Sequence, residues 1–124
     1  MAWVQRKSAF ELYEIPEGKM GISHSSKEFS TGYMEIMPGK ELAKHNRPVW
    51  EHLMQIKGSI EIKLFEGDSS RTVKLNENDT LDIPPFQFHI HSNINGSESS
   101  LTVWKADGDI TEIIDNIRKN KRLR

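Results

Sequence analysis

The sequence predicts an all-β protein in which many short antiparallel strands form a sandwich or a barrel. Two observations support this fold class. Short apolar runs that contain β-branched or aromatic residues recur along the chain, and groups of turn-forming residues separate them. Apolar and charged residues also alternate in the run 59–64, so that Ile60, Ile62 and Leu64 share one face of an extended strand and the charged residues share the other.

The strands are expected in a fixed order, with turns between them. Pro16 and Gly18 separate the first two runs, Pro38 and Gly39 follow the third, and Asn95-Gly96 has the form of a two-residue hairpin turn between the last two. The expected strands cover residues 10–15, 20–24, 31–37, 49–56, 59–65, 71–75, 80–83, 88–94 and 101–105. The barrel or sandwich therefore spans about 10–105.

The last part of the chain has a different periodicity. Ile110, Ile113, Ile114 and Ile117 recur at helical spacing, and Asp109 can cap the start of a helix. Basic residues, which suit the negative end of a helix dipole, crowd the end of the same segment: Arg118, Lys119, Lys121, Arg122 and Arg124. The sequence predicts a short α-helix over about 108–120, whose basic end is solvated.

Length and composition exclude several classes of protein. The chain has 124 residues, which is the size of one domain over 1–124. It contains no cysteine, so disulfides and thiolate sites are absent. Its 17 basic and 18 acidic residues give a net charge of -1, which provides no electrostatic basis for a nucleic-acid partner. No apolar run is long enough for a membrane span, and we expect a soluble cytoplasmic protein.

Two groups of polar residues have the spacing of a site. His45, Arg47 and Glu51 have the same parity, so an extended strand would project them to one face. Another group shares a face in the same way: Gln87, His89, His91 and Asn93. Imidazole and carboxylate together are the ligand set of Zn, Mn, Fe, Ni and Cu sites.

The first of these groups resembles a motif of the cupin superfamily, which reads G-x5-H-x-H-x3-E-x6-G. The chain matches every spacing, beginning at Gly39 and passing through His45 and Glu51 to Gly58. It departs from the motif at Arg47, which stands in the place of the second histidine.

The second group resembles the other cupin motif, G-x5-P-x-G-x2-H-x3-N. Pro84, His89 and Asn93 match it, whereas Asn78 and Phe86 stand in the places of the two glycines. Asparagine tolerates the same left-handed turn as glycine, and phenylalanine is a less conservative replacement. The two motifs together span residues 39–93.

The resemblance implies a jelly-roll barrel, in many members a homodimer, with a divalent metal ion at its centre. Carried over residue by residue, it makes His45, Glu51 and His89 the metal ligands. Arg47 is not a ligand, because a guanidinium stays protonated and has no lone pair to offer. A small anionic ligand, such as a keto acid or a sugar acid, would contact Arg47, Gln87 and His91.

Three functions remain open from the sequence. The first is a metal-dependent enzyme with isomerase, lyase or dioxygenase chemistry, between which the fold does not choose. The second is a metal-free barrel that binds a sugar or an organic acid. In that case Arg47 and Glu51 would form a direct ion pair. The third is a dimerisation module without catalysis.

Overall fold

The structure is a computed structural model, and it describes residues 10–124. It consists of two antiparallel sheets and one helix, α1 (Thr111–Ile117). The larger sheet has the order β10-β1-β2-β3-β9-β4-β7. Its strands are β10 (Lys121–Arg122), β1 (Glu11–Ile15), β2 (Gly18–Ser25), β3 (Ser30–Ile36), β9 (Ser100–Asp107), β4 (Trp50–Lys57) and β7 (Thr80–Ile83). The smaller sheet has the order β6-β5-β8, formed by β6 (Ser69–Leu75), β5 (Ile60–Glu66) and β8 (His89–Ser92).

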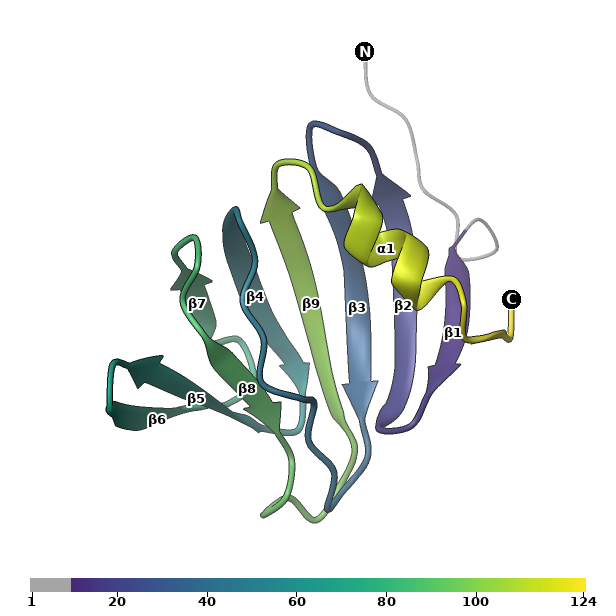
Figure 1. Cartoon of the computed structure of the whole chain (residues 1–124). Coiled ribbons are helices and arrows are strands. Elements are labelled where there is room, and N and C mark those ends of the chain that lie inside the picture. The colour runs from purple at the N-terminus through teal and green to yellow at the C-terminus, as the bar shows by residue number, and fades with distance from the viewer. Residues whose placement is uncertain (1–9) are drawn as a thin grey trace.

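The antiparallel all-β fold class is confirmed, and so are all nine expected strands, with ends that differ by a few residues. The chain passes from the larger sheet into the smaller one and back, so strands that are distant in sequence become neighbours. The smaller sheet and α1 lie on the same side of the larger sheet, the smaller sheet near β4 and β7 and α1 over β2 and β3 (Figure 1). This face is the interior of the barrel.

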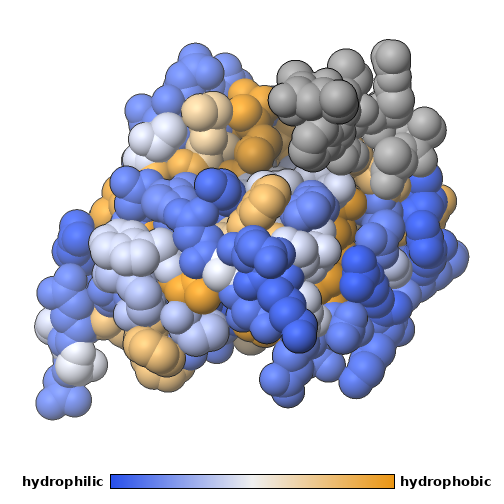
Figure 2. All heavy atoms as spheres, turned by 90° about the horizontal axis from the view of Figure 1, so that it is seen from above, coloured by the Kyte–Doolittle hydropathy of each residue, from blue (hydrophilic) through white to orange (hydrophobic). Residues whose placement is uncertain are grey.

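The core is formed by residues that alternate along the strands. Ile60, Ile62 and Leu64 of β5 are buried, as the alternation predicts, and Ile36 and Ile83 face them from the larger sheet. Burial of one such side chain stabilises the fold by roughly 1.5–3 kcal/mol. On the face seen in Figure 2 the surface is mostly hydrophilic, and hydrophobic side chains show only in patches.

The prediction of a β-hairpin at Asn95-Gly96 is wrong. β8 pairs only with β5 among the described strands, and β9 pairs with β3 and β4, so this turn connects the two sheets. The Asn93 side chain holds the connection, because its Nδ2 donates to the carbonyl oxygens of Ile36 and Glu98, both at 2.9 Å. An Asn-Gly pair specifies a tight turn, but it does not decide whether the flanking strands pair with each other.

The C-terminal segment is partly as expected. The helix is shorter than 108–120, and Asp109 accepts the backbone N–H of Thr111 at its start. The basic segment after the helix does not extend it. Lys121 and Arg122 instead form β10, which pairs with Tyr13 and Glu14 of β1 and covers part of the sheet edge. No helix within residues 10–124 is long and apolar enough to cross a membrane.

One ion pair fastens α1 to β1, and it predicts a pH dependence. Nε and Nη2 of Arg118 donate to the two carboxylate oxygens of Glu11, both at 2.9 Å. Mainly because of this contact, the pKa of Glu11 falls from 4.5 to about 2. The folded state therefore gains stability that is complete above pH 4.5 and is lost as the pH falls from there to about 2.

We expect Glu11→Gln to lower the free energy of unfolding by about 1 kcal/mol at pH 7. The difference from the wild type should close as the pH is lowered towards 2, and urea unfolding at a series of pH values measures it. Glu14→Gln is the matched control on the same strand, since Glu14 lies 4.0 Å from the exposed Lys121. A difference between wild type and Glu11→Gln that is constant with pH would contradict the prediction.

Candidate metal centre and ligand chamber

Three histidines meet inside the barrel. His89 and His91 point inward from alternate positions of β8 and are 0% and 1% exposed. His45 lies before β4, and its backbone pairs with that of His89 through two hydrogen bonds of 2.9 and 3.0 Å. One ring nitrogen from each of the three lies within 4.8 Å of the others. We call His45, His89 and His91 the imidazole group.

The hydrogen bonds of the imidazole group leave ring nitrogens free. Nδ1 of His45 bonds the carbonyl oxygen of Ala43, and Nδ1 of His89 bonds that of Gln87, both at 2.8 Å. A carbonyl oxygen only accepts, so these two Nδ1 atoms carry the proton and each Nε2 keeps its lone pair. Nε2 of His89 and Nδ1 of His91 are buried and have no hydrogen-bond partner among the described residues. Buried polar atoms without partners are rare, and here they fit a bound ion.

The imidazole group is electrically neutral near pH 7. Burial lowers the pKa of His45 to about 4, and the nearby charge of Arg47 lowers it further in the same direction. Burial also lowers the pKa values of His89 and, more strongly, of His91. Metal binding requires unprotonated imidazole, so the rings are in the state in which they can bind a divalent ion.

Glu51 of β4 stands next to this group. Its side chain is buried, and Oε1 lies 3.7 Å from Nε2 of His89 without a hydrogen-bond partner among the described residues. Burial raises the pKa of Glu51, and the charge of Arg47 opposes this shift. Of the expected ligands, His45 and His89 thus lie in the imidazole group, Glu51 lies beside it, and His91 joins it.

Arg47 is half-buried and has no partner of opposite charge among the described residues. Its Nη1 donates to the carbonyl oxygen of Asn46 at 3.0 Å. Within residues 10–124 no carboxylate oxygen lies within 4.0 Å of its guanidinium, so the direct ion pair with Glu51 that a metal-free site would form is not present. Burial lowers the pKa of Arg47, and Glu51 opposes this shift. The guanidinium is therefore free to bind an anion.

The backbone turns of the two motifs keep the left-handed conformation although glycine is replaced. Asn78 has φ 72° and Phe86 has φ 67°. For phenylalanine this conformation costs roughly 1–2 kcal/mol. Phe86 donates its backbone N–H to the carbonyl oxygen of Arg47 at 2.7 Å, and its own carbonyl oxygen accepts Nδ2 of Asn46. This strained turn therefore holds the segment that carries Arg47 beside the site.

A cavity of about 50 Å³, which we call the chamber, lies next to the imidazole group. Its polar end contains His45, Arg47, Glu51 and His91. The remainder is apolar and is lined by Met20, Met34, Leu42, Trp104, Ile110, Ile113, Ile114 and Ile117.

Three further features concern Gln87, Trp104 and the isoleucines near α1. Gln87 donates Nε2 to the carbonyl oxygen of Phe65 at 2.6 Å and does not line the chamber, so its role in ligand binding still rests on the sequence alone. Trp104 is a core residue whose buried Nε1 has no partner within the described chain. For the isoleucines at 110, 113, 114 and 117, the sequence predicts only that they share one face of a helix. Their helical periodicity shows that they pack, but not that they pack over a site.

Comparisons with known proteins identify the fold. No family model and no curated protein matches the sequence. Among solved structures, oxalate decarboxylase of Bacillus subtilis, studied for its Mn(II) centres, superposes with a TM-score of 0.71 and 25% identity over 80% of this chain and 28% of that one. Vicilin from hazelnut (Corylus avellana) has a TM-score of 0.72 and 16% identity over 83% of this chain and 32% of that one.

A third neighbour matches over most of its own length. Drosophila melanogaster CENP-C bound to CAL1 has a TM-score of 0.73 and 12% identity, over 82% of both chains. The chain spans about a third of the length of vicilin and of the decarboxylase, but most of the CENP-C chain. The antiparallel sheets, the two motifs with their left-handed turns and these neighbours agree: the chain has the cupin jelly-roll fold.

Proposed function

We propose that the protein binds one divalent metal ion through His45, His89 and His91, with Glu51 beside it, and a small carboxylate through Arg47. The observation that carries the proposal is the imidazole group, in which neutral rings meet and buried ring nitrogens have no hydrogen-bond partner within residues 10–124. This ligand set suits Zn, Mn, Fe, Ni or Cu. The likeness to a decarboxylase with Mn(II) centres supports a metal and an acidic ligand.

The roles of the protein's own groups follow from their surroundings. Arg47 has no carboxylate partner in the described chain, so its fork of N–H groups can bind both oxygens of a ligand carboxylate. Because burial raises the pKa of Glu51, this residue can hold a proton nearer neutral pH than an exposed carboxyl group and can transfer it at Oε1. When bound, the metal would supply Lewis-acid polarisation of a ligand oxygen. Isomerase, lyase and dioxygenase reactions all remain compatible with these groups.

We also propose that the protein is a homodimer. The outer face of the larger sheet exposes apolar side chains from neighbouring strands, among them Met54, Ile56 and Val103. Apolar residues that cluster on one exposed face suit an interface. The sheet edge at β1 is partly covered by β10, which leaves less of it for pairing between subunits.

Native mass spectrometry of protein purified without a histidine tag tests both proposals. We expect a mass of two chains with one metal ion per chain, and removal of the metal by a chelator should lower the melting temperature. Protein that contains no metal and takes none up would refute the metal proposal. Stabilisation by neutral sugars but not by carboxylates would then support the metal-free alternative. A monomeric mass at micromolar concentration would refute the dimer.

A further inference from the structure

One helix face forms a wall of the chamber. Ile110, Ile113, Ile114 and Ile117 recur at the three- and four-residue spacing that places side chains on one face of a helix. All four line the chamber together with the polar residues His45, Arg47, Glu51 and His91. In Figure 1, α1 lies across β2 and β3, on the same side of the larger sheet as the smaller sheet. We call these four isoleucines the helix wall.

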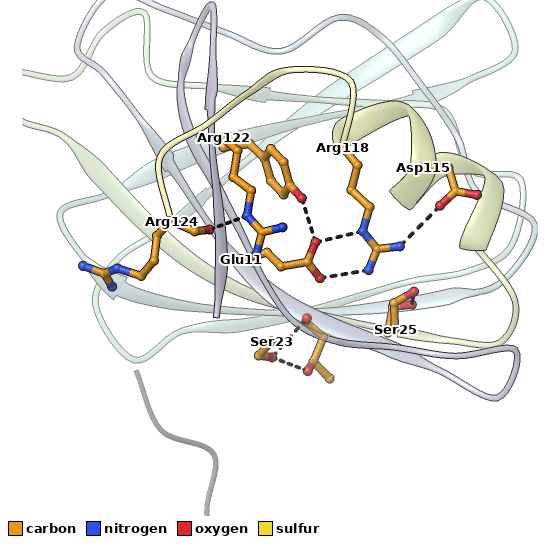
Figure 3. Close-up of polar contacts among 10 residues, drawn as sticks. Glu11, Ser23, Ser25, Asp115, Arg118, Arg122 and Arg124 are labelled. Carbon is orange, nitrogen blue, oxygen red and sulfur yellow. Dashed lines mark hydrogen bonds and ion pairs between the residues drawn. The ribbon is translucent and has the colours of Figure 1, made fainter. Parts of the chain in front are cut away.

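The helix wall is fixed in place at its end. Figure 3 shows Arg118 between Glu11 and Asp115, with both carboxylate oxygens of Glu11 bound to its guanidinium. Beyond the helix the chain pairs with β1, where Leu123 donates its backbone N–H to the carbonyl oxygen of Leu12 at 2.7 Å. Ile114, in the middle of the wall, is fully buried. A bound molecule that pushes the wall outward must therefore break these contacts.

The chamber has two chemically different kinds of lining and little free space. Arg47, Glu51, His45 and His91 supply its polar lining, and the isoleucines of the helix wall supply branched aliphatic lining. A free volume of about 50 Å³ has room for only a few waters or a few non-hydrogen atoms of a ligand, since a cavity needs about 10–15 Å³ of such volume to hold one water. Polar groups at the apolar end of a ligand would be buried without hydrogen bonds, which costs roughly 1–3 kcal/mol each.

We propose that the helix wall selects the substrate class of this site, namely carboxylates with a short aliphatic body and no polar group at the far end. The inference rests on the proposed function, in which Arg47 holds the carboxylate. It adds that the length of the aliphatic body is limited by Ile113 and Ile117. These two side chains are half-buried, so they can be shortened with less damage to the core than Ile114.

The test is a titration with a series of straight-chain acids. Acetate, propionate, butyrate and hexanoate are added to protein that carries one equivalent of Zn²⁺ and isoleucine methyl labels, and NMR shifts give the dissociation constants. We expect hexanoate to bind the wild type at least tenfold more weakly than propionate. In the double variant Ile113→Ala, Ile117→Ala the hexanoate affinity should rise at least tenfold and that of acetate should change little.

A matched control is Ile15→Ala. Ile15 is half-buried and packs against the core, but it does not line the chamber, so this variant should keep the wild-type preference. Should the double variant not fold, Ile113→Val removes one methyl group and should still move the preference towards butyrate. The methyl signals of Ile113 and Ile117 should shift in the wild type when propionate is added.

Three results would overturn the inference. The first is a chain-length preference that is the same in the wild type and in the variant. The second is binding of acids without any shift of the Ile113 and Ile117 methyl signals. The third is Zn²⁺ binding without binding of any acid, which would leave the metal centre of the proposed function intact. Absence of both Zn²⁺ and acid binding would refute the proposed function together with the inference.

Discussion

Replacing His89 with alanine should abolish metal binding. The His89 ring is completely buried, and its Nε2 faces the group without a partner in the described chain. Removing it leaves two imidazoles and the carboxylate of Glu51, whose Oε1 lies 3.7 Å from Nε2 of His89 in the wild type. We expect the affinity for Zn²⁺ to fall at least ~100-fold, since loss of even outer-shell partners costs 10–100-fold. Competition with a chromophoric chelator measures the change.

The control for this variant is His24→Ala. His24 stacks on Phe29 at a ring distance of 4.4 Å and takes no part in the imidazole group, so its removal should leave metal content unchanged. Circular dichroism of both variants separates loss of the site from loss of the fold. Backbone pairing of residue 89 with His45 does not depend on the side chain, which favours a folded variant. Full metal content in folded His89→Ala would show that the metal binds elsewhere and would refute this site.

Arg47→His should raise metal affinity and lower the affinity for acids. The change places an imidazole where the cupin motif has one, and it removes a cation that lies near His45, His89 and His91. Affinity for Zn²⁺ should rise at least ~10-fold. Affinity for propionate should fall roughly 10–100-fold, because a charged hydrogen-bonding group contributes about 1.5–3 kcal/mol. Isothermal titration calorimetry with Zn²⁺ and then with propionate measures both effects.

Arg71→His is the matched control, since Arg71 is an exposed residue of β6 that lies 3.6 Å from Glu66. Both affinities should stay at the wild-type value in that variant. No gain in Zn²⁺ affinity in Arg47→His would reject the arrangement of a metal and an acid in one site. A variant that is only less stable would point to a structural role for Arg47.

Much of the fold was predictable because strand formation is a local property. The alternation of Ile60, Ile62 and Leu64 fixes which face of β5 is buried, and the same rule places His89 and His91 on one face of β8. The turn residues determine where the strands end, and Asn78 adopts the left-handed conformation that the motif predicts. The two motif spacings identified the jelly roll. The single-domain organisation, the cytoplasmic location and the homodimer stay predictions.

Other features were not predictable because they depend on which distant segments meet. Asn95-Gly96 reads as a hairpin in any local window, but the strands on either side belong to different sheets. β10 is too short to be recognised from sequence, and it exists because β1 offers an unpaired edge. The helical spacing of Ile113 and Ile117 predicts a buried face. The same spacing occurs in a helix that packs on a solid core and in one that lines a cavity, so the sequence does not distinguish the two.

By itself the sequence determined the strands, the turns, the inward direction of His89 and His91, and a fixed positive charge at Arg47. These follow from backbone preferences and from the two-residue period within a strand. Only the tertiary structure decided that the backbone of His45 pairs with that of His89 and that His91 completes the imidazole group beside Glu51. It also decided that Arg47 forms no ion pair with Glu51 and that α1 lines the chamber. The physical reason is that such meetings are fixed by register and packing between segments far apart in the chain, and no local pattern encodes those distances.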